Sequence, residues 1–316
     1  MLWLLRRVGV SILLVWIVAT VVFLAIHLVP GDPAELLLSQ GGVAPDPAAV
    51  AELRTQLGLD RPILVQYAAS MNGLLHGNLG QSLEDQSPVA ATVMQRLPRT
   101  LELIAASAIF AVLVGLPTGT LSAIRRGGAF DRIASWLAGL ALAVPVFVTG
   151  TLIVLVFAQA LGWLPAGGYV PFAQAPGRHL LLLSMPAFTI GIGLAAVVVR
   201  ITRAAVLDVM MRDHVRTARA KGLAPRRVLL RHVVRNALSP VVTVLGLQLG
   251  ALLGGTVLVE YVFNWPGLSS LLVEAVNARD YTEVEGIVLV ISVLFVTLNL
   301  IIDLLYAALD PRVRHG

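Results

Sequence analysis

Six long apolar runs constrain the fold of this chain more than any other feature of its sequence. The hydrocarbon core of a bilayer is about 30 Å thick, and an α-helix of about 20 apolar residues crosses it. Because backbone polar groups must be satisfied inside such a segment, runs of this length predict spanning helices. The predicted spans are residues 8–28, 100–124, 133–161, 180–199, 238–261 and 284–309. Only 13% of the residues are charged, against roughly 25% in a soluble domain, so the sequence predicts an all-α membrane protein.

The positive charges predict the orientation of these spans, because cytoplasmic loops of membrane proteins carry an excess of Lys and Arg. The residues placed inside are Arg6, Arg7, Arg125, Arg126, Arg132, the ten basic residues from Arg200 to Arg235, Arg312 and Arg314. Those placed outside are Arg54, Arg61, Arg96, Arg99, Arg178 and Arg279. The asymmetry predicts six spans with both the N- and the C-terminus in the cytoplasm.

The predicted spans divide the chain into three parts. Residues 1–29 form a basic tail and the first span. Its apolar run is longer than the roughly 7–15 residues of a signal-peptide core, and no small-residue cleavage site follows it. Residues 30–98 form an extracytoplasmic segment, and residues 99–316 form a core of five spans that includes a cytoplasmic loop at 205–236.

The extracytoplasmic segment 30–98 predicts two short helices. Asp46 as N-cap, Pro47 at the start and Gly58 as the terminating residue bound a helix over 48–57. A second helix is predicted over 63–75. Such a segment either contacts a substrate-binding protein, covers a pathway or serves as a structural loop, and the sequence leaves these alternatives open.

The cytoplasmic loop around residues 208–236 carries the highest charge density and clear helix punctuation. Asp213 is predicted to be an N-cap, and Gly222 stands where a helix of about two turns would end in a left-handed residue. Pro225 suits the first turn of a second helix that continues into the next span. The pattern predicts a short helix, a glycine hinge and a new helix. Such a part suits docking, although a charged loop that only sets topology would share most of these features.

A few polar groups fall within the predicted spans, where ionisable residues are costly. Glu102 and Glu260 lie near the outer ends and are predicted to snorkel towards water. Asp303 lies near the inner end of the last span, with Asn299 one turn earlier, and predicts a structural ion pair or a functional site. The residues that predict either helix packing or a pathway wall are Gln248, Gly246 and Gly250.

The sequence gives little support to catalysis or to a metal site. The chain has no cysteine, and its six histidines are scattered without a metal-ligand spacing. Lys221 is the only lysine and lies outside any Gly-x-x-x-x-Gly-Lys-Ser/Thr pattern, so the chain has no P-loop for ATP. No nucleophile elbow or zinc-protease motif occurs. We therefore expect a non-enzymatic transport chain.

Residues 216–223 read Arg-Thr-Ala-Arg-Ala-Lys-Gly-Leu, with Asp213-His-Val before them and Arg235-Asn-Ala-Leu-Ser-Pro240 after them. This segment resembles the EAA loop of ABC-importer permeases, in the form of the dipeptide/oligopeptide/nickel branch. The family pattern is Glu-Ala-Ala, three residues and Gly; Ala218 and Gly222 keep it, whereas Arg216 and Thr217 depart from it. Further likeness lies in residues 31–33, 57–62, 77–82, 246–250, 253–255, 259–260, 265–268, 278–281, 303–306 and 310–312.

The resemblance implies a type I importer permease fold in the cytoplasmic (inner) membrane. It implies that the chain moves di- or oligopeptides together with a homologous second permease, two cytoplasmic P-loop ATPases and an extracytoplasmic substrate-binding protein. ATP and Mg²⁺ would then bind on the ATPases, with no cofactor on this chain and no nucleic acid as a partner. The residues implied to couple the permease to the ATPases are Asp213, Arg216, Thr217, Ala218, Arg219, Ala220, Lys221, Gly222, Leu223 and Pro225.

Other functions remain open alongside this one. Within the same family, the cargo would be nickel or another small solute instead of peptides. In a different class, a secondary transporter or channel would move solute alone, driven by a gradient and without an ATPase. An intramembrane enzyme would need a catalytic pair, which the sequence does not contain.

Overall fold

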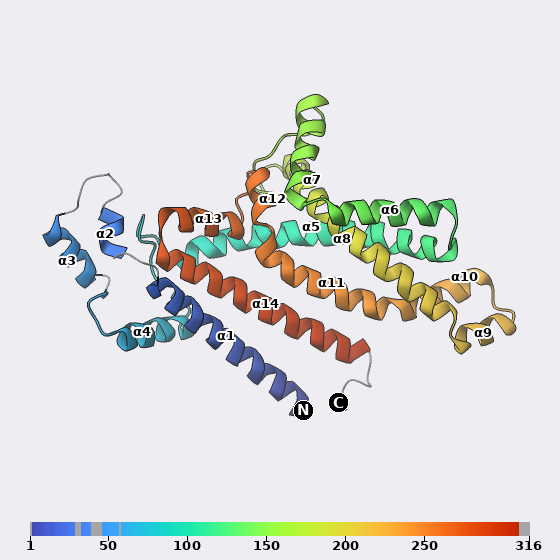
Figure 1. Ribbon diagram of the computed structural model, residues 1–316, viewed down its shortest axis with the longest axis horizontal. Helices are drawn as coiled ribbons and strands as arrows, with labels where there is room; N and C mark the ends of the chain where they lie inside the picture. Colours follow the sequence, from blue (N-terminus) through green and yellow to red (C-terminus); the bar gives the residue numbers. More distant parts are fainter. Residues whose placement is uncertain (1, 29–32, 39–45, 57, 310–316) are drawn as a thin grey trace. The chain divides into compact units, whose positions relative to one another are not determined.

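The computed structural model describes residues 2–28, 33–38, 46–56 and 58–309, and within them the fold is built from helices (Figure 1). Their only extended pairing is an isolated bridge between Gln81 and Pro88. The π-helical segments are η2 (Val154–Ala160) and η3 (Val228–Val234). The α-helices are α1 (Leu2–Leu28), α2 (Pro33–Leu38), α3 (Pro47–Gln56), α4 (Ile63–Leu75), α5 (Val89–Ile124), α6 (Ala129–Ala143), α7 (Val146–Ile153), α8 (Pro176–Met210), α9 (Asp213–Ala220), α10 (Pro225–Arg227), α11 (Arg235–Gly255), α12 (Val257–Val262), α13 (Leu268–Ala278) and α14 (Tyr281–Leu309).

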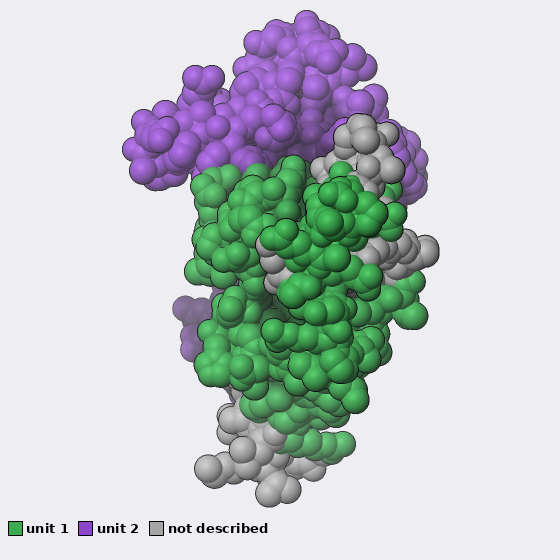
Figure 2. Space-filling model, turned by 90° about the vertical axis from the view of Figure 1, so that its left-hand side faces the viewer, with its two compact units in different colours: residues 1–99, 267–300 green, residues 100–266, 301–316 purple. Residues whose placement is uncertain are grey.

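The chain divides into two compact units, which Figure 2 shows in different colours. Unit 1 combines residues 1–99 with 267–300, and unit 2 combines residues 100–266 with 301–316. Unit 1 is centred on Val89, Val93, Leu268, Leu271, Ala275 and Ile287. Unit 2 has its largest buried cluster around Trp265 and Phe263, packed against the first half of α8.

Five of the six predicted spans are helices that are long and apolar enough to cross a membrane, among the described residues. They are Arg6–Ala25 of α1, α5, α8, the continuous stretch Pro225–Gly255, and Tyr281–Ile301 of α14. Several boundaries differ from prediction. The second span starts as early as Val89, and the fourth predicted span is part of a longer helix, Pro176–Met210. The fifth span lies in the stretch Pro225–Gly255 and ends at Gly255, after which α12 forms a separate helix.

The third predicted span is broken rather than straight. The α6 helix ends at Ala143, and α7 with η2 continues after a bend of 103°. Val144 has an extended backbone with ψ of 126°, as expected for a residue before proline. Pro145 then precedes the first residue of α7. In contrast, Pro186 lies inside α8 without ending it.

The two helices predicted in segment 30–98 form close to their predicted bounds. Asp46 accepts a hydrogen bond from the backbone N–H of Ala48 at 3.1 Å, and so caps α3. Gly58 has φ of +67°, which fits its predicted role as terminator, although the predicted last helical residue, Leu57, lies outside the described residues. The α4 helix covers the predicted residues 63–75.

The prediction that Glu260 snorkels to water is wrong. Its side chain is fully buried in unit 2, where it accepts hydrogen bonds from Thr100 Oγ1 at 2.8 Å and Thr256 Oγ1 at 3.0 Å. Two hydroxyl donors replace water around the carboxylate, so burial becomes tolerable. Glu102 is 36% exposed, and its Oε1 lies 2.7 Å from Nε2 of the buried His179.

Candidate functional site

The α9 helix of unit 2 is fixed to the protein by one face only. Val215 and Ala218, three residues apart on the same side of the helix, are buried with exposures of 0% and 5%. They pack in a cluster with Ala123 of α5, Val206 and Val209 of α8, Val228 and Val233 of η3, and Ala237 of α11. A helix of two turns is marginal in isolation, so this apolar anchor is what holds α9 in place.

The opposite face of α9 is exposed and rich in cations. The exposed residues are Asp213, His214, Arg216, Thr217, Arg219 and Ala220, followed by Lys221 and Gly222 after the helix. Arg216 lies 3.8 Å from Asp213, an exposed pair whose energetic contribution is small. Within the described part of the chain, Arg219 and Lys221 form no ion pair. This face therefore presents positive charge to solvent.

The start of α9 corrects one prediction. The N-cap is Arg212, with ψ of 148°, and Asp213 is the first residue of the helix. The carbonyl oxygen of Arg212 accepts hydrogen bonds from the N–H groups of Val215 and Arg216, at 3.0 and 3.3 Å. Asp213 makes no side-chain cap there, but its charge in the first turn is favourable to the helix dipole.

The end of α9 is built as the sequence predicts. Gly222 has φ of +72°, its N–H donates to the carbonyl of Arg219 at 2.9 Å, and the N–H of Leu223 donates to that of Ala218 at 3.4 Å. This pair of bonds is a Schellman motif, which favours glycine because a Cβ is strained at positive φ. No other group lies within 4 Å of where a Cβ at Gly222 would stand, so conformation alone selects glycine inside this chain. Pro225 is the first residue of α10, as predicted.

A groove of about 470 Å³ lies beside the hinge between α9 and α10. It is lined by Ile124, Met210, Arg219, Leu223, Pro225, Arg226, Val228, Leu229 and Val233. Apolar side chains form most of its wall, with two arginines among them. Three predicted coupling residues, Arg219, Leu223 and Pro225, thus line the same groove, although α9 and α10 are separate helices.

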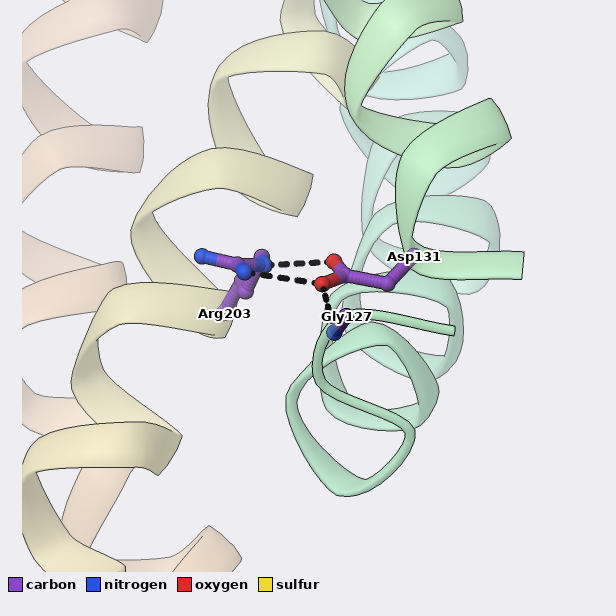
Figure 3. Close-up of polar contacts among 3 residues, drawn as sticks. All are labelled: Gly127, Asp131 and Arg203. Carbon is purple, nitrogen blue, oxygen red and sulfur yellow. Dashed lines mark hydrogen bonds and ion pairs between the residues drawn. The ribbon is translucent and has the colours of Figure 1, made fainter. Parts of the chain in front are cut away.

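An ion pair connects the start of α6 to α8, the helix that carries α9 (Figure 3). Arg203 donates through Nε to Asp131 Oδ1 at 2.6 Å and through a terminal nitrogen to Oδ2 at 2.9 Å. The backbone N–H of Gly127 donates to the same Oδ2 at 2.9 Å. The Asp131 side chain is 5% exposed, whereas that of Arg203 is 30% exposed. Sequence reasoning missed this pair; the signal was a lone acid at a helix start among arginines.

Sequence reasoning also missed the glycine contact between α5 and α8. A Cβ at Gly115 would lie 2.7 Å from the side chain of Val198, and one at Gly119 would lie 2.7 Å from the carbonyl oxygen of Val199. Gly115 and Gly119 form a small-xxx-small pair, which permits close approach of two membrane helices.

The other predicted residues in the spans are not brought together with the α9 segment in one site. Gly246 and Gly250 are buried in α11, and Gln248 between them is half-buried. The side-chain amide of Asn299 donates to the carbonyl of Phe295 at 2.8 Å, within its own helix. The side chain of Asp303 and the tail 310–316 lie outside the described residues. No group of three or more His, Cys, Asp or Glu residues in the described part of the chain is arranged to hold a metal ion.

Comparison with known proteins gives the family. Residues 115–315 match the model of the binding-protein-dependent transport system inner membrane component, and residues 1–104 match its N-terminal companion. The glutathione transport system permease protein GsiC of Salmonella choleraesuis strain SC-B67 is 42% identical over 95% of this chain and 94% of its own length. Its counterparts in Pectobacterium atrosepticum and Escherichia coli K12 are 43% and 41% identical, over the same shares of the chains.

Solved structures support the same fold. The inward-facing MetNI methionine ABC transporter aligns with 69% of this chain and 96% of its own, at a TM-score of 0.58 and 17% identity. An amino acid ABC transporter with histidines aligns over 69% and 94%, at a TM-score of 0.53 and 17% identity. The fold is thus that of a type I ABC importer permease. The chain belongs to the binding-protein-dependent transport system inner membrane component family and is a multi-pass inner-membrane permease of an ABC importer.

Proposed function

We propose that this permease imports short peptides and that α9 is the element through which separate ATPase subunits drive it. The observation that carries the proposal is the two-faced construction of α9. Its buried Val215 and Ala218 join it to α5, α8, η3 and α11, while its cationic face is exposed. A load applied to that face would reach several helices at once, because they share one packed cluster.

The proposed mechanism follows from this connection. The exposed face of α9 seats in a groove with an acidic rim on an ATPase, and Gly222 gives the chain a sharp exit without a side chain in the way. ATP then brings two ATPases together, and α9 moves with them. Packed helices move as rigid bodies. The ion pair of Asp131 and Arg203 ties α6 to α8, so both helices follow α9 and the pathway alternates between the two sides.

The cargo proposal rests on the relatives. Those with 41–43% identity are permeases of glutathione transport systems. Glutathione is a short peptide, so a peptide of this size class is the cargo that fits both the relatives and the branch resemblance. Nickel or another small solute in the same family is the alternative, and direct competition in uptake separates the two.

The proposed assembly contains this chain, a homologous second permease, two cytoplasmic P-loop ATPases and an extracytoplasmic binding protein. ATP and Mg²⁺ bind on the ATPases. Both termini of this chain and α9 face the cytoplasm, as the distribution of arginine predicts.

The first experiment targets the hinge. We expect Gly222→Asp to abolish ATP-driven uptake while the permease still inserts and the assembly still hydrolyses ATP, because a charged side chain enters the docking surface. Gly222→Asn is the matched control, since Asn has nearly the same size and both residues tolerate a left-handed conformation. Loss of uptake in both variants indicates that docking needs close approach of the backbone at this position. Loss of uptake only in the Asp variant indicates that the negative charge is what disrupts docking. Wild-type uptake by the Asp variant contradicts docking through this segment.

The second experiment tests assembly and cargo. Affinity-purified permease is expected to bring down two P-loop ATPases, and ATP hydrolysis by the complete assembly with its binding protein is expected to rise with glutathione or a dipeptide but not with Ni²⁺. If Ni²⁺ but no peptide stimulates ATP hydrolysis, the cargo is the metal and the peptide proposal is wrong. Uptake by vesicles that contain no ATPase would favour a gradient-driven transporter and overturn the proposal.

A further inference from the structure

The α4 helix of unit 1 has an unusual distribution of polar side chains. It contains no charged residue in Ile63–Leu75, and none of its residues is fully buried. Its large apolar side chains are strongly exposed, with Leu64 at 77% and Leu75 at 85%. Ile63 and Val65 are also exposed, at 49% and 46%. A helix in water normally turns such residues inwards.

Three of the four polar side chains of α4 contact the protein instead, and the fourth, Asn72, is exposed. The hydroxyl of Tyr67 lies 2.8 Å from Thr20 Oγ1 of α1, and Gln66 Oε1 lies 3.2 Å from His27 Nε2. Ser70 Oγ donates to Glu285 Oε1 of α14 at 2.8 Å. These contacting residues recur at positions that share one helix face. Apart from Asn72, the polarity of α4 is therefore reversed relative to a water-exposed helix.

The contacts also fix the depth of α4. Thr20 lies inside the apolar window Arg6–Ala25 of α1, about 8 Å along the helix from its outer end at 1.5 Å per residue. The ring of Tyr67 packs edge-on against Phe23, at 5.3 Å between centroids, so the ring itself lies beside the last turns of the span. Glu285 lies one turn into α14, whose apolar window begins at Tyr281. Both attachments of α4, to α1 and to α14, thus lie within about two turns of the end of an apolar span.

We propose that α4 lies in the bilayer as an interfacial helix, with Leu64, Leu75 and the apolar residues beside them in contact with lipid acyl chains. The leaflet is the one in which α1 ends at Leu28, which is the extracytoplasmic leaflet in the proposed topology. Interfacial helices bury their apolar face about 5–10 Å into the boundary of headgroups and acyl chains. Here the protein satisfies the polar face, and no cationic face is needed.

Lipid fits this surface better than a soluble partner. The exposed side of α4 has no charge for a protein to pair with. The α1 helix that α4 packs against also exposes apolar side chains, with Val21 and Leu24 at 57% and 46%. The low dielectric of hydrocarbon would also strengthen the hydrogen bond between the hydroxyls of Thr20 and Tyr67. The inference rests only on the membrane location of the chain and not on its cargo or its ATPases.

The absence of cysteine makes a direct test simple. Nitroxide labels are placed at Leu64→Cys and Leu75→Cys in the assembled transporter in lipid nanodiscs, and power saturation compares access of oxygen with access of a water-soluble nickel chelate. Ile12→Cys, at 65% exposure in the α1 span, is the lipid reference. Ala49→Cys, exposed on α3, is the aqueous reference.

The expected result is that both α4 labels are accessible to oxygen and protected from the chelate, with ratios near that of Ile12→Cys. Ratios near that of Ala49→Cys would show that α4 is in water, and would overturn the proposal. Protection from both reagents would show that a protein covers the face, which also overturns it. Repeating the measurement without the binding protein identifies whether that subunit is the cover.

Discussion

At the residue scale, each buried acid among the described residues has at least one hydrogen-bond donor that is distant in sequence. Glu260 is held by Thr100 and Thr256 in unit 2. Asp280 in unit 1 is fully buried, and its Oδ2 accepts hydrogen bonds from Ser82 Oγ at 2.6 Å and from the backbone N–H of Leu83 at 2.8 Å. Its Oδ1 accepts one from the backbone N–H of Glu283 and so caps α14. Since an unsatisfied buried charge is far more costly than a paired one, loss of a partner is the sensitive change.

The pair of Asp131 and Arg203 gives the clearest test at this scale. Arg203→Met leaves Asp131 without its cationic partner and is expected to lower stability by about 1–3 kcal/mol, less than for a fully buried pair because Arg203 is 30% exposed. The measurement is the thermal midpoint of the purified permease in detergent. The double variant with Asp131→Asn removes the orphaned charge and is expected to recover most of the loss. An equal or larger loss in the double variant would show that the ion pair is not the cause.

At the element scale, helix faces made of small residues decide which helices approach closely. The α5 and α8 helices meet at Gly115 and Gly119, where added atoms would overlap Val198 and Val199. The α9 helix is held by a second kind of contact, in which Val215 and Ala218 enter an apolar cluster. Helix contact and helix anchoring are thus separate properties that separate substitutions can test.

Close packing of α5 on α8 predicts opposite outcomes for two glycines. Gly119→Ala places a Cβ against backbone and is expected to destabilise the permease by about 1–3 kcal/mol. Gly193→Ala, in α8 with nothing within 4 Å of the added atom, is expected to be neutral or to stabilise by up to about 1 kcal/mol from helix propensity. Thermal midpoints of the two variants check this. Similar midpoints for both would contradict the close contact.

The anchor of α9 predicts a local effect on dynamics. Val215→Ala removes two methyl groups from a fully buried side chain, which is about 1.6 kcal/mol of transfer free energy at about 0.8 kcal/mol per group. We expect faster backbone hydrogen exchange in residues 213–221 and weaker coupling of ATP hydrolysis to uptake. Leu230→Ala, at a position 66% exposed, is the control and should leave exchange in 213–221 unchanged. Unchanged exchange in the Val215 variant would show that α9 is held by other contacts.

At the scale of the whole molecule, the order of spans and loops defines which surfaces share a side of the membrane. The connection after α8 contains α9, and the connection before α8 is the loop that follows η2. A broken third span still leaves room for six crossings, since α6, α7 and η2 together meet the length and apolarity needed. Orientation then depends on where the arginines lie.

The single lysine gives a direct test of that orientation. A membrane-impermeant amine reagent is expected to leave wild-type permease unlabelled in intact cells, because Lys221 and the N-terminus both face the cytoplasm in the proposed topology. Inverted vesicles should be labelled, and binding of the ATPases should protect Lys221. Trp163→Lys, at a loop position 69% exposed between η2 and α8, is the positive control in intact cells. Labelling of the wild type from outside would reverse the topology.

The sequence by itself determined those features that depend on neighbouring residues. Apolar length placed the spans, and the start of α4 followed from Pro62 before it. The left-handed Gly222 and the starting Pro225 were predictable because backbone preference is local. The side of the membrane on which each charged loop lies stays a prediction from the sequence, since that rule counts residues in loops.

The tertiary structure alone decided which distant residues meet. Nothing near Glu260 in sequence predicts the hydroxyl of Thr100, so only folding shows that this acid is buried rather than snorkelling. The same holds for Arg203 with Asp131, for the anchored face of α9 and for the polar face of α4 against α1 and α14. The physical reason is that pairing and burial arise from contacts between helices. The size of the bend at Pro145 is likewise set by the packing around it, since proline dictates only that a helix is interrupted.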